Sequence, residues 1–204
     1  MLVTNSKKPL KIITISLLVL IIVLTLGYMG FYTYGRSIDV TIKGVNYQLG
    51  PDNSEVLQPE TLTIKGTWSR SLKGIRTFKG TITFEHDSNP VPLESRETTV
   101  RFTPEGFGVV SYIYLENTSS GGVMPRAYSY GVLFANSDFS SVTFQRMRED
   151  EVTTGRPPGR GWSGKDGLMF AGPATTREQA LMISNGLMKK HLNNNYVGGQ
   201  YVLK

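Results

Sequence analysis

A glycine-rich segment near the C-terminus comes closest to a known chemical motif in this chain. Gly159–Gly164 fits G-x-G-x-x-G, and Gly159–Lys165 fits the G-x-x-x-x-G-K start of a phosphate-binding loop. A dinucleotide site needs a strand before these glycines and a helix after them, and a phosphate loop needs Ser or Thr after the lysine. Here Pro157 and Pro158 precede the glycines and Asp166 follows the lysine. We therefore predict no nucleotide binding.

The same segment places cations around an aromatic ring, since Arg156, Arg160 and Lys165 surround Trp162. Such a group could bind an anionic polymer, a lipid headgroup or a carboxylate of an envelope protein partner. The alternative is a solvated loop whose charges serve solubility. These four residues are our binding-site hypothesis.

Catalytic and metal-binding patterns are sparse. The chain has no cysteine and two histidines, which removes thiol chemistry and cysteine-ligated zinc. Glu85, His86 and Asp87 are adjacent, and neighbouring strand residues point to opposite faces, so we predict a strand-to-turn corner with solvated side chains. We assign no catalytic residue, no cofactor and no metal ligand.

An apolar segment near the N-terminus predicts a transmembrane helix over residues 12–35, where no charged residue occurs. Lys7, Lys8 and Lys11 precede it, and the positive-inside tendency places residues 1–11 in the cytoplasm and residues 36–204 outside. A cleaved signal peptide is the alternative, but its apolar region is usually shorter.

The formal charge of +6 does not indicate a nucleic-acid-binding protein. The three lysines before the apolar segment account for half of it, so the displayed part is nearly neutral. We therefore predict no nucleic acid among the partners and expect the lipid bilayer, entered through residues 12–35, as the main one.

Beyond residue 36 the dominant hydrophobic period is two, which is typical of half-buried strands. The alternation is clearest over 62–68, 78–84, 99–102 and 142–145. Turn residues separate these runs, so we predict a mainly antiparallel all-β domain, a sandwich or a barrel. The segments 109–115 and 128–134 are apolar on both faces, which predicts strands near the middle of the sheet.

Two features break the strand pattern. Residues 149–167 predict a long exposed loop because of their glycines and prolines. Residues 175–192 predict one amphipathic C-terminal helix, with Thr175 or Thr176 at its start and Lys189, Lys190 and His191 in its last turn.

The sequence thus predicts a single-pass membrane protein that displays a non-catalytic β-rich binding or structural domain. One alternative is an envelope-associated hydrolase or transferase whose carboxylates converge only in three dimensions. A second alternative is a carrier of a small apolar ligand, which needs a barrel cavity lined by residues such as Trp68, Phe78 and Tyr130.

Overall fold

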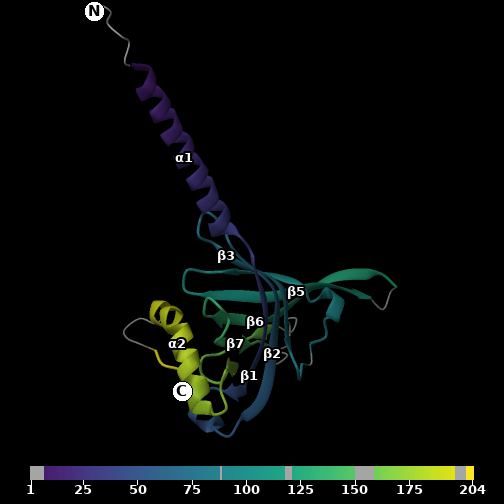
Figure 1. Ribbon diagram of the computed structural model, residues 1–204. Helices are drawn as coiled ribbons and strands as arrows, with labels where there is room; N and C mark the ends of the chain where they lie inside the picture. The colour runs from purple at the N-terminus through teal and green to yellow at the C-terminus, as the bar shows by residue number, and fades with distance from the viewer. Residues whose placement is uncertain (1–6, 88, 118–120, 150–158, 196–200) are drawn as a thin grey trace, which may run out of the picture.

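The structure is a computed structural model that describes residues 7–87, 89–117, 121–149, 159–195 and 201–204. Its first element, α1 (Lys7–Thr33), is a continuous helix that stands clear of the rest of the chain (Figure 1). The stretch Ile12–Thr33 is apolar and long enough to cross a bilayer, and none of its most apolar window is buried. A buried core helix is therefore excluded, because a core helix would be covered by other elements.

Eight strands form one closed antiparallel barrel, in which each strand pairs with the next along the chain and the last returns to the first. This is the up-and-down topology, which leaves the barrel without an open edge. The strands are β1 (Arg36–Gln48), β2 (Leu57–Arg70), β3 (Arg76–Phe84), β4 (Thr98–Phe102), β5 (Phe107–Asn117), β6 (Val123–Ala135), β7 (Val142–Arg146) and β10 (Leu168–Gly172). Of the two predicted architectures, the barrel is the one observed.

Short elements complete the connections. Two 3-10 turns, η1 (Pro51–Asn53) and η2 (Leu93–Ser95), follow β1 and precede β4. The strands β8 (Arg148–Glu149) and β9 (Arg160–Gly161) pair with each other at the two ends of the predicted loop 149–167. The nine residues between Glu149 and Gly159 lie outside the described part of the chain.

Aromatic side chains fill the barrel interior. Near α1, the Trp68 ring meets the rings of Phe102 and Phe139 edge-on, with centroids 5.0 and 5.2 Å apart. Further in, Phe84 meets Phe144 and Phe170 in the same way. Phe139 lies in the turn after β6 and has a φ of 59°, which a bulky residue rarely adopts. Its ring is fully buried, so the turn closes this end of the barrel.

The helix α2 (Arg177–Asn195) covers the outer face of β10, β7 and β1. Ala180, Met188 and Leu192 of this helix face the barrel and belong to a second buried apolar cluster. Its start matches the prediction, because the Thr176 hydroxyl accepts a hydrogen bond from the Gln179 backbone N–H. Its end does not, because the helix continues to Asn195.

His191 therefore lies one turn before the end of α2 and has another role. Its ring meets the rings of Phe107 and Phe134 edge-on, at 4.9 and 5.4 Å. Burial lowers the pKa of His191 below its usual value. Packing against these two rings accounts for the partial burial of His191.

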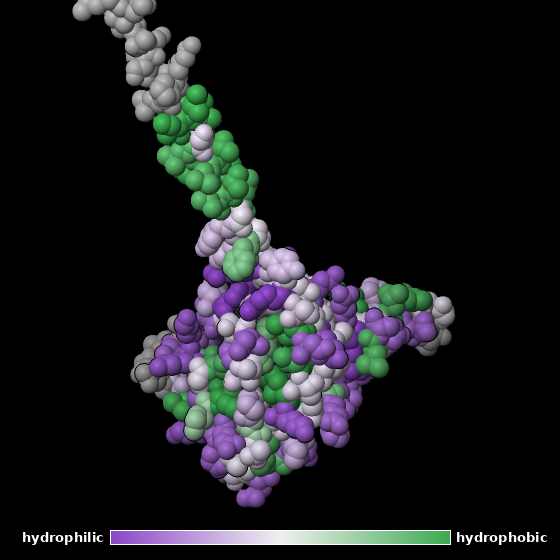
Figure 2. Space-filling view, viewed as in Figure 1, coloured by the Kyte–Doolittle hydropathy of each residue, from purple (hydrophilic) through white to green (hydrophobic). Residues whose placement is uncertain are grey.

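The distal parts of β5 and β6 form a two-stranded arm that leaves the barrel (Figure 1). Ile113, Leu115 and Val123 on this arm are 60–75% exposed, and Figure 2 shows the hydrophobic surface on it. The prediction that 109–115 lies near the middle of the sheet was therefore wrong. It was right for the end of β6, where Leu133 faces the interior and Phe134 faces α2.

Candidate binding site

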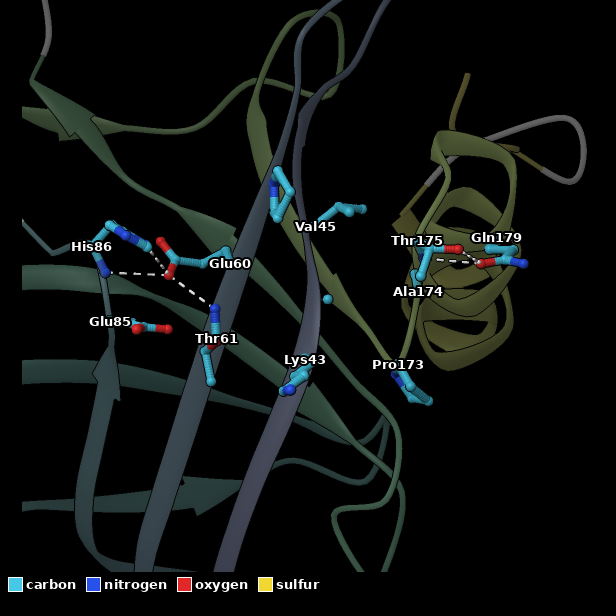
Figure 3. A pocket seen from close by; sticks show the side chains of 12 residues that line it. Lys43, Val45, Glu60, Thr61, Glu85, His86, Pro173, Ala174, Thr175 and Gln179 are labelled. Carbon is cyan, nitrogen blue, oxygen red and sulfur yellow. Dashed lines mark hydrogen bonds and ion pairs between the residues drawn. The ribbon is translucent and has the colours of Figure 1, made fainter.

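A recess of about 690 Å³ lies on the outer wall of the barrel, where β1 and β2 face the segment that leads into α2. We call it the wall groove. Figure 3 shows Val45 of β1 and Ala174 of that segment facing the space from opposite sides. Its apolar part is formed by Val45, Pro59, Pro173 and Ala174, and its polar rim by Lys43, Thr61, Glu85, His86, Thr175 and Gln179.

Local sequence explains why the groove stays open. The chain leaves β10 at Gly172 and begins α2 only at Arg177, so a short non-helical segment, whose Ala174 belongs to the same apolar cluster as Val45, forms one side of the groove. The Gln179 side chain accepts hydrogen bonds from the backbone N–H and the hydroxyl of Thr175, at 2.9 and 3.1 Å. These contacts hold the rim on the α2 side in one position.

Glu60 separates the wall groove from the end of the barrel interior. Its carboxylate is 1% exposed and accepts hydrogen bonds from the backbone N–H groups of Thr61 and His86 and from the Asn46 amide. The His86 ring lies 3.3 Å from the same carboxylate (Figure 3). Burial alone would raise the pKa of Glu60, but these hydrogen bonds together lower it below 4.5, so the group is ionised at neutral pH.

On the other side of Glu60 a polar cavity of about 390 Å³ opens at the end of the barrel opposite α1. We call it the arginine basin, because Arg146, Arg148 and Arg160 line it. Its most buried acid is Asp87, whose side chain is 6% exposed. Asp87 accepts hydrogen bonds from the Tyr130 hydroxyl at 2.7 Å and from Arg96 at 3.4 Å. The prediction of a solvated corner at Asp87 was therefore wrong.

The two buried carboxylates share one cation. Arg146 lies 3.8 Å from both Glu60 and Asp87, and its guanidinium stands over the Phe84 ring at 4.6 Å. Burial, with the nearby charge of Asp87, raises the pKa of the Tyr130 hydroxyl well above its usual range, so that hydroxyl keeps its proton. The arrangement is a largely buried ion cluster at this end of the barrel, beside the arginine basin.

This geometry gives the hydrolase alternative no support among the described residues. A pair of catalytic carboxylates needs one acid whose pKa is raised, so that it can donate a proton. Glu60 has a lowered pKa instead, and Arg146 binds it together with Asp87. Within the described ranges, no cluster of three or more His, Asp or Glu side chains is placed to hold a metal ion.

The four predicted binding residues do not meet on one described surface. Arg160 lines the arginine basin, donates hydrogen bonds to the carbonyls of Met147 and Ser129, and lies over the Tyr128 ring. Trp162 donates to the Leu168 carbonyl and packs against the cluster beneath α2.

The other two members of that set lie elsewhere. Lys165 lines a separate recess beside Tyr201 and Lys204, and Arg156 lies outside the described residues. Arg160 and Trp162 thus have contacts that explain them structurally, and ligand binding by the set stays a prediction. The wall groove was missed because it joins β1, β2 and the start of α2, which are far apart in sequence.

A carrier of a small apolar ligand would need a cavity inside the barrel, but packed aromatic rings fill the interior at the predicted position. Trp68 and Phe78 both contact the inserted Phe139 ring, and both are nearly or fully buried. Tyr130 packs against Phe144 and places its hydroxyl on Asp87. Side chains therefore occupy the space that an internal ligand would need around these three residues.

Fold and recesses together define a class of protein: an N-terminal apolar helix that could enter a bilayer, followed by a closed eight-stranded antiparallel barrel with a helix on its wall. Comparison with protein-family models, with curated proteins and with solved structures finds no match for this chain. The functional argument therefore rests on the chain's own residues.

Proposed function

We propose that this chain is a single-pass membrane protein, with residues 1–11 in the cytoplasm, and that its barrel binds a small, largely apolar ligand outside the membrane in the wall groove. The observation that carries the proposal is the groove itself. Its volume of about 690 Å³ lies within the range of small-molecule sites. An apolar floor with a few polar groups at the rim is the usual composition of such a site.

The kind of ligand follows from the groove's walls. A peptide added as an extra strand would need free backbone N–H groups on β2, but Pro59 at this point has none. Val45 and Ala174 offer apolar contact, while Lys43 and the exposed His86 ring offer polar contact at the rim. A compact molecule with an apolar body and one polar end fits these walls.

The anchor part of the proposal is supported by exposure and by the core. The side chains of α1 around Leu17–Leu24 are about half exposed or more, and bulk water would solvate such a surface poorly. No residue of α1 belongs to either buried apolar cluster of the barrel. Residues 36–204 therefore retain their whole core without α1 and can be studied as a soluble fragment.

The test uses that fragment and the fluorescent probe 1-anilinonaphthalene-8-sulfonate, which has an apolar body and one charged end. Pro59→Trp puts a large ring into the groove and should weaken probe binding at least about tenfold. Thr63→Trp is the matched control, because Thr63 lies on the same strand and the same face but outside the groove. Binding in Thr63→Trp should stay within about twofold of the wild type.

Near-ultraviolet circular dichroism should show the same folded barrel in both variants. If the two variants bind the probe equally, or if the wild-type fragment binds none, the groove is not the binding site.

A further inference from the structure

The turn between β2 and β3 lies at the foot of α1. Arg70, at the end of β2, places its guanidinium 4.7 Å from the ring centre of Tyr32, in the last turns of α1. Only Tyr34 and Gly35 separate α1 from β1, so the barrel has little freedom to move away from the helix. Figure 1 shows this turn beside the end of α1. We call residues 70–76 the proximal turn.

Backbone contacts give the proximal turn a fixed shape. The Gly74 N–H donates to the Ser71 carbonyl, and the Ser71 N–H donates to the Ile75 carbonyl. Gly74 has a φ of 80°, which glycine adopts without strain. These contacts fix the backbone of the turn.

Those side chains are apolar at the tip and cationic on both sides. Leu72 is 58% exposed and Ile75 is 46% exposed, and neither belongs to a described core cluster. Arg70, Lys73 and Arg76 form no ion pair with any described carboxylate. The sequence contains no acid from Thr61 to Phe84, so the strands that carry the turn add no negative charge.

Other charges at this end of the barrel come from neighbouring turns. Arg36 begins β1 and donates to the Ser137 carbonyl, next to Asp138. Glu105 lies in the turn before β5. The charges acting on these two acids are those of Arg36 on Asp138 and of His191 and Lys190 on Glu105. Neither acid forms an ion pair with a cation of the proximal turn.

The depth of the turn is set by α1. Tyr28 and Phe31 on the last turns of this helix, and Tyr34 just after it, are exposed, and such rings collect at the membrane–water interface. The contact between Arg70 and Tyr32 places the proximal turn at the same level. Two exposed apolar side chains flanked by three cations are suited to that interface.

We propose that the proximal turn is a second membrane contact, in which Leu72 and Ile75 enter the outer interface of the bilayer and Arg70, Lys73 and Arg76 bind the phosphates of anionic lipids. This rests on the proposed anchor, because α1 must span the bilayer for the turn to reach it. The contact would hold the barrel in one orientation on the membrane and direct the arginine basin away from it.

The absence of cysteine makes a clean test available, since a single introduced cysteine is the only labelling site. The full chain carries Leu72→Cys with an environment-sensitive fluorophore and is reconstituted in vesicles of phosphatidylcholine with a minor share of phosphatidylglycerol. Lipids with a quenching group at the headgroup–acyl boundary report depth. Quenching at position 72 should exceed quenching at Leu93→Cys about threefold, because Leu93 is more exposed than Leu72 but lies beyond β3 on the loop near Arg96.

Charge variants test the lipid contact itself. In the labelled chain, Lys73→Glu with Arg76→Glu should reduce quenching at position 72 to the level of Leu93→Cys. Lys165→Glu is the control, because Lys165 lies in the recess near Gly50 at the far end of the barrel. It should change nothing. Vesicles of phosphatidylcholine alone should also reduce the quenching at position 72.

A label at Met29→Cys, within α1, separates this inference from the anchor. Quenching at position 29 without quenching at position 72 would leave the anchor in place and overturn the second contact. No quenching at either position would overturn both. Quenching at position 72 that persists in the charge-reversed variant would show that the cations do not bind lipid.

Discussion

At the scale of single residues, the buried ion cluster at the barrel end is the feature that sequence patterns conceal. Glu85, His86 and Asp87 are consecutive, but the strand ends at Phe84, so their side chains no longer alternate between two faces. His86 stays exposed while Asp87 turns inward to Tyr130. Asp87 can stay buried because Arg96 and the Tyr130 hydroxyl supply the hydrogen bonds that water would otherwise make to its carboxylate. These partners are not adjacent to Asp87 in the sequence, so the local pattern does not reveal them.

Arg96 holds the loop before β4 by three bonds, so replacing it should be costly. Its guanidinium donates to the carbonyls of Val91 at 2.8 Å and Asn89 at 2.9 Å as well as to Asp87. Lysine keeps the charge but cannot serve three acceptors in this planar arrangement. Arg96→Lys should lower the free energy of unfolding of residues 36–204 by about 2–4 kcal/mol in urea denaturation.

Arg126→Lys is the matched control for that change. Arg126 pairs with Glu116 on the exposed arm, where solvent screens the interaction. Arg126→Lys should therefore leave the free energy of unfolding nearly unchanged. Equal losses in the two variants would show that the Arg96 cluster adds no special stability.

The lowered pKa of Glu60 predicts how the free energy of unfolding depends on pH. Because hydrogen bonds lower the pKa of the folded carboxyl below 4.5, its ionised form stabilises the fold above that pH, and the stabilisation is lost as the pH falls through the folded pKa. The difference in unfolding free energy between wild type and Glu60→Gln should therefore be largest near neutral pH and shrink as the pH falls below 4.5.

The comparison for Glu60 is Glu97→Gln, which removes the exposed partner of Lys79. Its difference from wild type should stay under about 0.5 kcal/mol at every pH measured. A Glu60→Gln difference that grows in acid would contradict the assignment of Glu60 as an ionised acceptor.

At the scale of elements, α2 shows how a helix turns one barrel wall into a second core. The residues of β1, β6 and β10 that face α2 are apolar, and they form one buried cluster with the helix. One polar bridge crosses this layer: the Ser184 hydroxyl lies 2.7 Å from both the Tyr47 and the Thr143 hydroxyls. Burial, opposed only in part by this bridge, raises the pKa of Tyr47 to about 12, so the bridge stays neutral.

Two methionines of α2 give a direct measure of this second core. Met188 is fully buried against the barrel wall, whereas Met182 is 74% exposed on the same helix. Met188→Ala should lower the free energy of unfolding by about 2–4 kcal/mol, through lost burial and the cavity left behind. Met182→Ala should change it by less than about 0.5 kcal/mol, and similar losses in both would mean that α2 is not held by this face.

At the scale of the whole molecule, local periodicity predicts the individual strands and the helix but not how they pair and pack. Alternation over residues 62–68 and 78–84 marks strands because one face is buried and the other solvated. It does not show that β10 returns to pair with β1, since that contact joins residues more than a hundred positions apart. The wall groove and the ion cluster depend on that closure, so neither could be found from spacing.

The prediction for residues 109–115, which form part of the arm, was wrong for a related reason. A segment that is apolar on both faces is usually buried on both, as the end of β6 is beneath α2. The same pattern in β5 continues into a ribbon that projects from the barrel, and no local signal distinguishes the two cases. The N-terminal helix could be predicted from local sequence alone, because its length, its apolar composition and its flanking charges all lie within or next to the segment.

The topology of the whole chain yields the last prediction. Lysines before α1 predict that the short N-terminal segment stays in the cytoplasm, which leaves the barrel outside. The chain has no cysteine, so Ser6→Cys and Met182→Cys can each be probed alone with a membrane-impermeant maleimide on intact cells. Met182→Cys should react and Ser6→Cys should react only after lysis. Reaction at position 6 in intact cells would reverse the orientation, and a Met182→Cys product released from the membrane and shortened by about the length of α1 would show a cleaved signal peptide in place of an anchor.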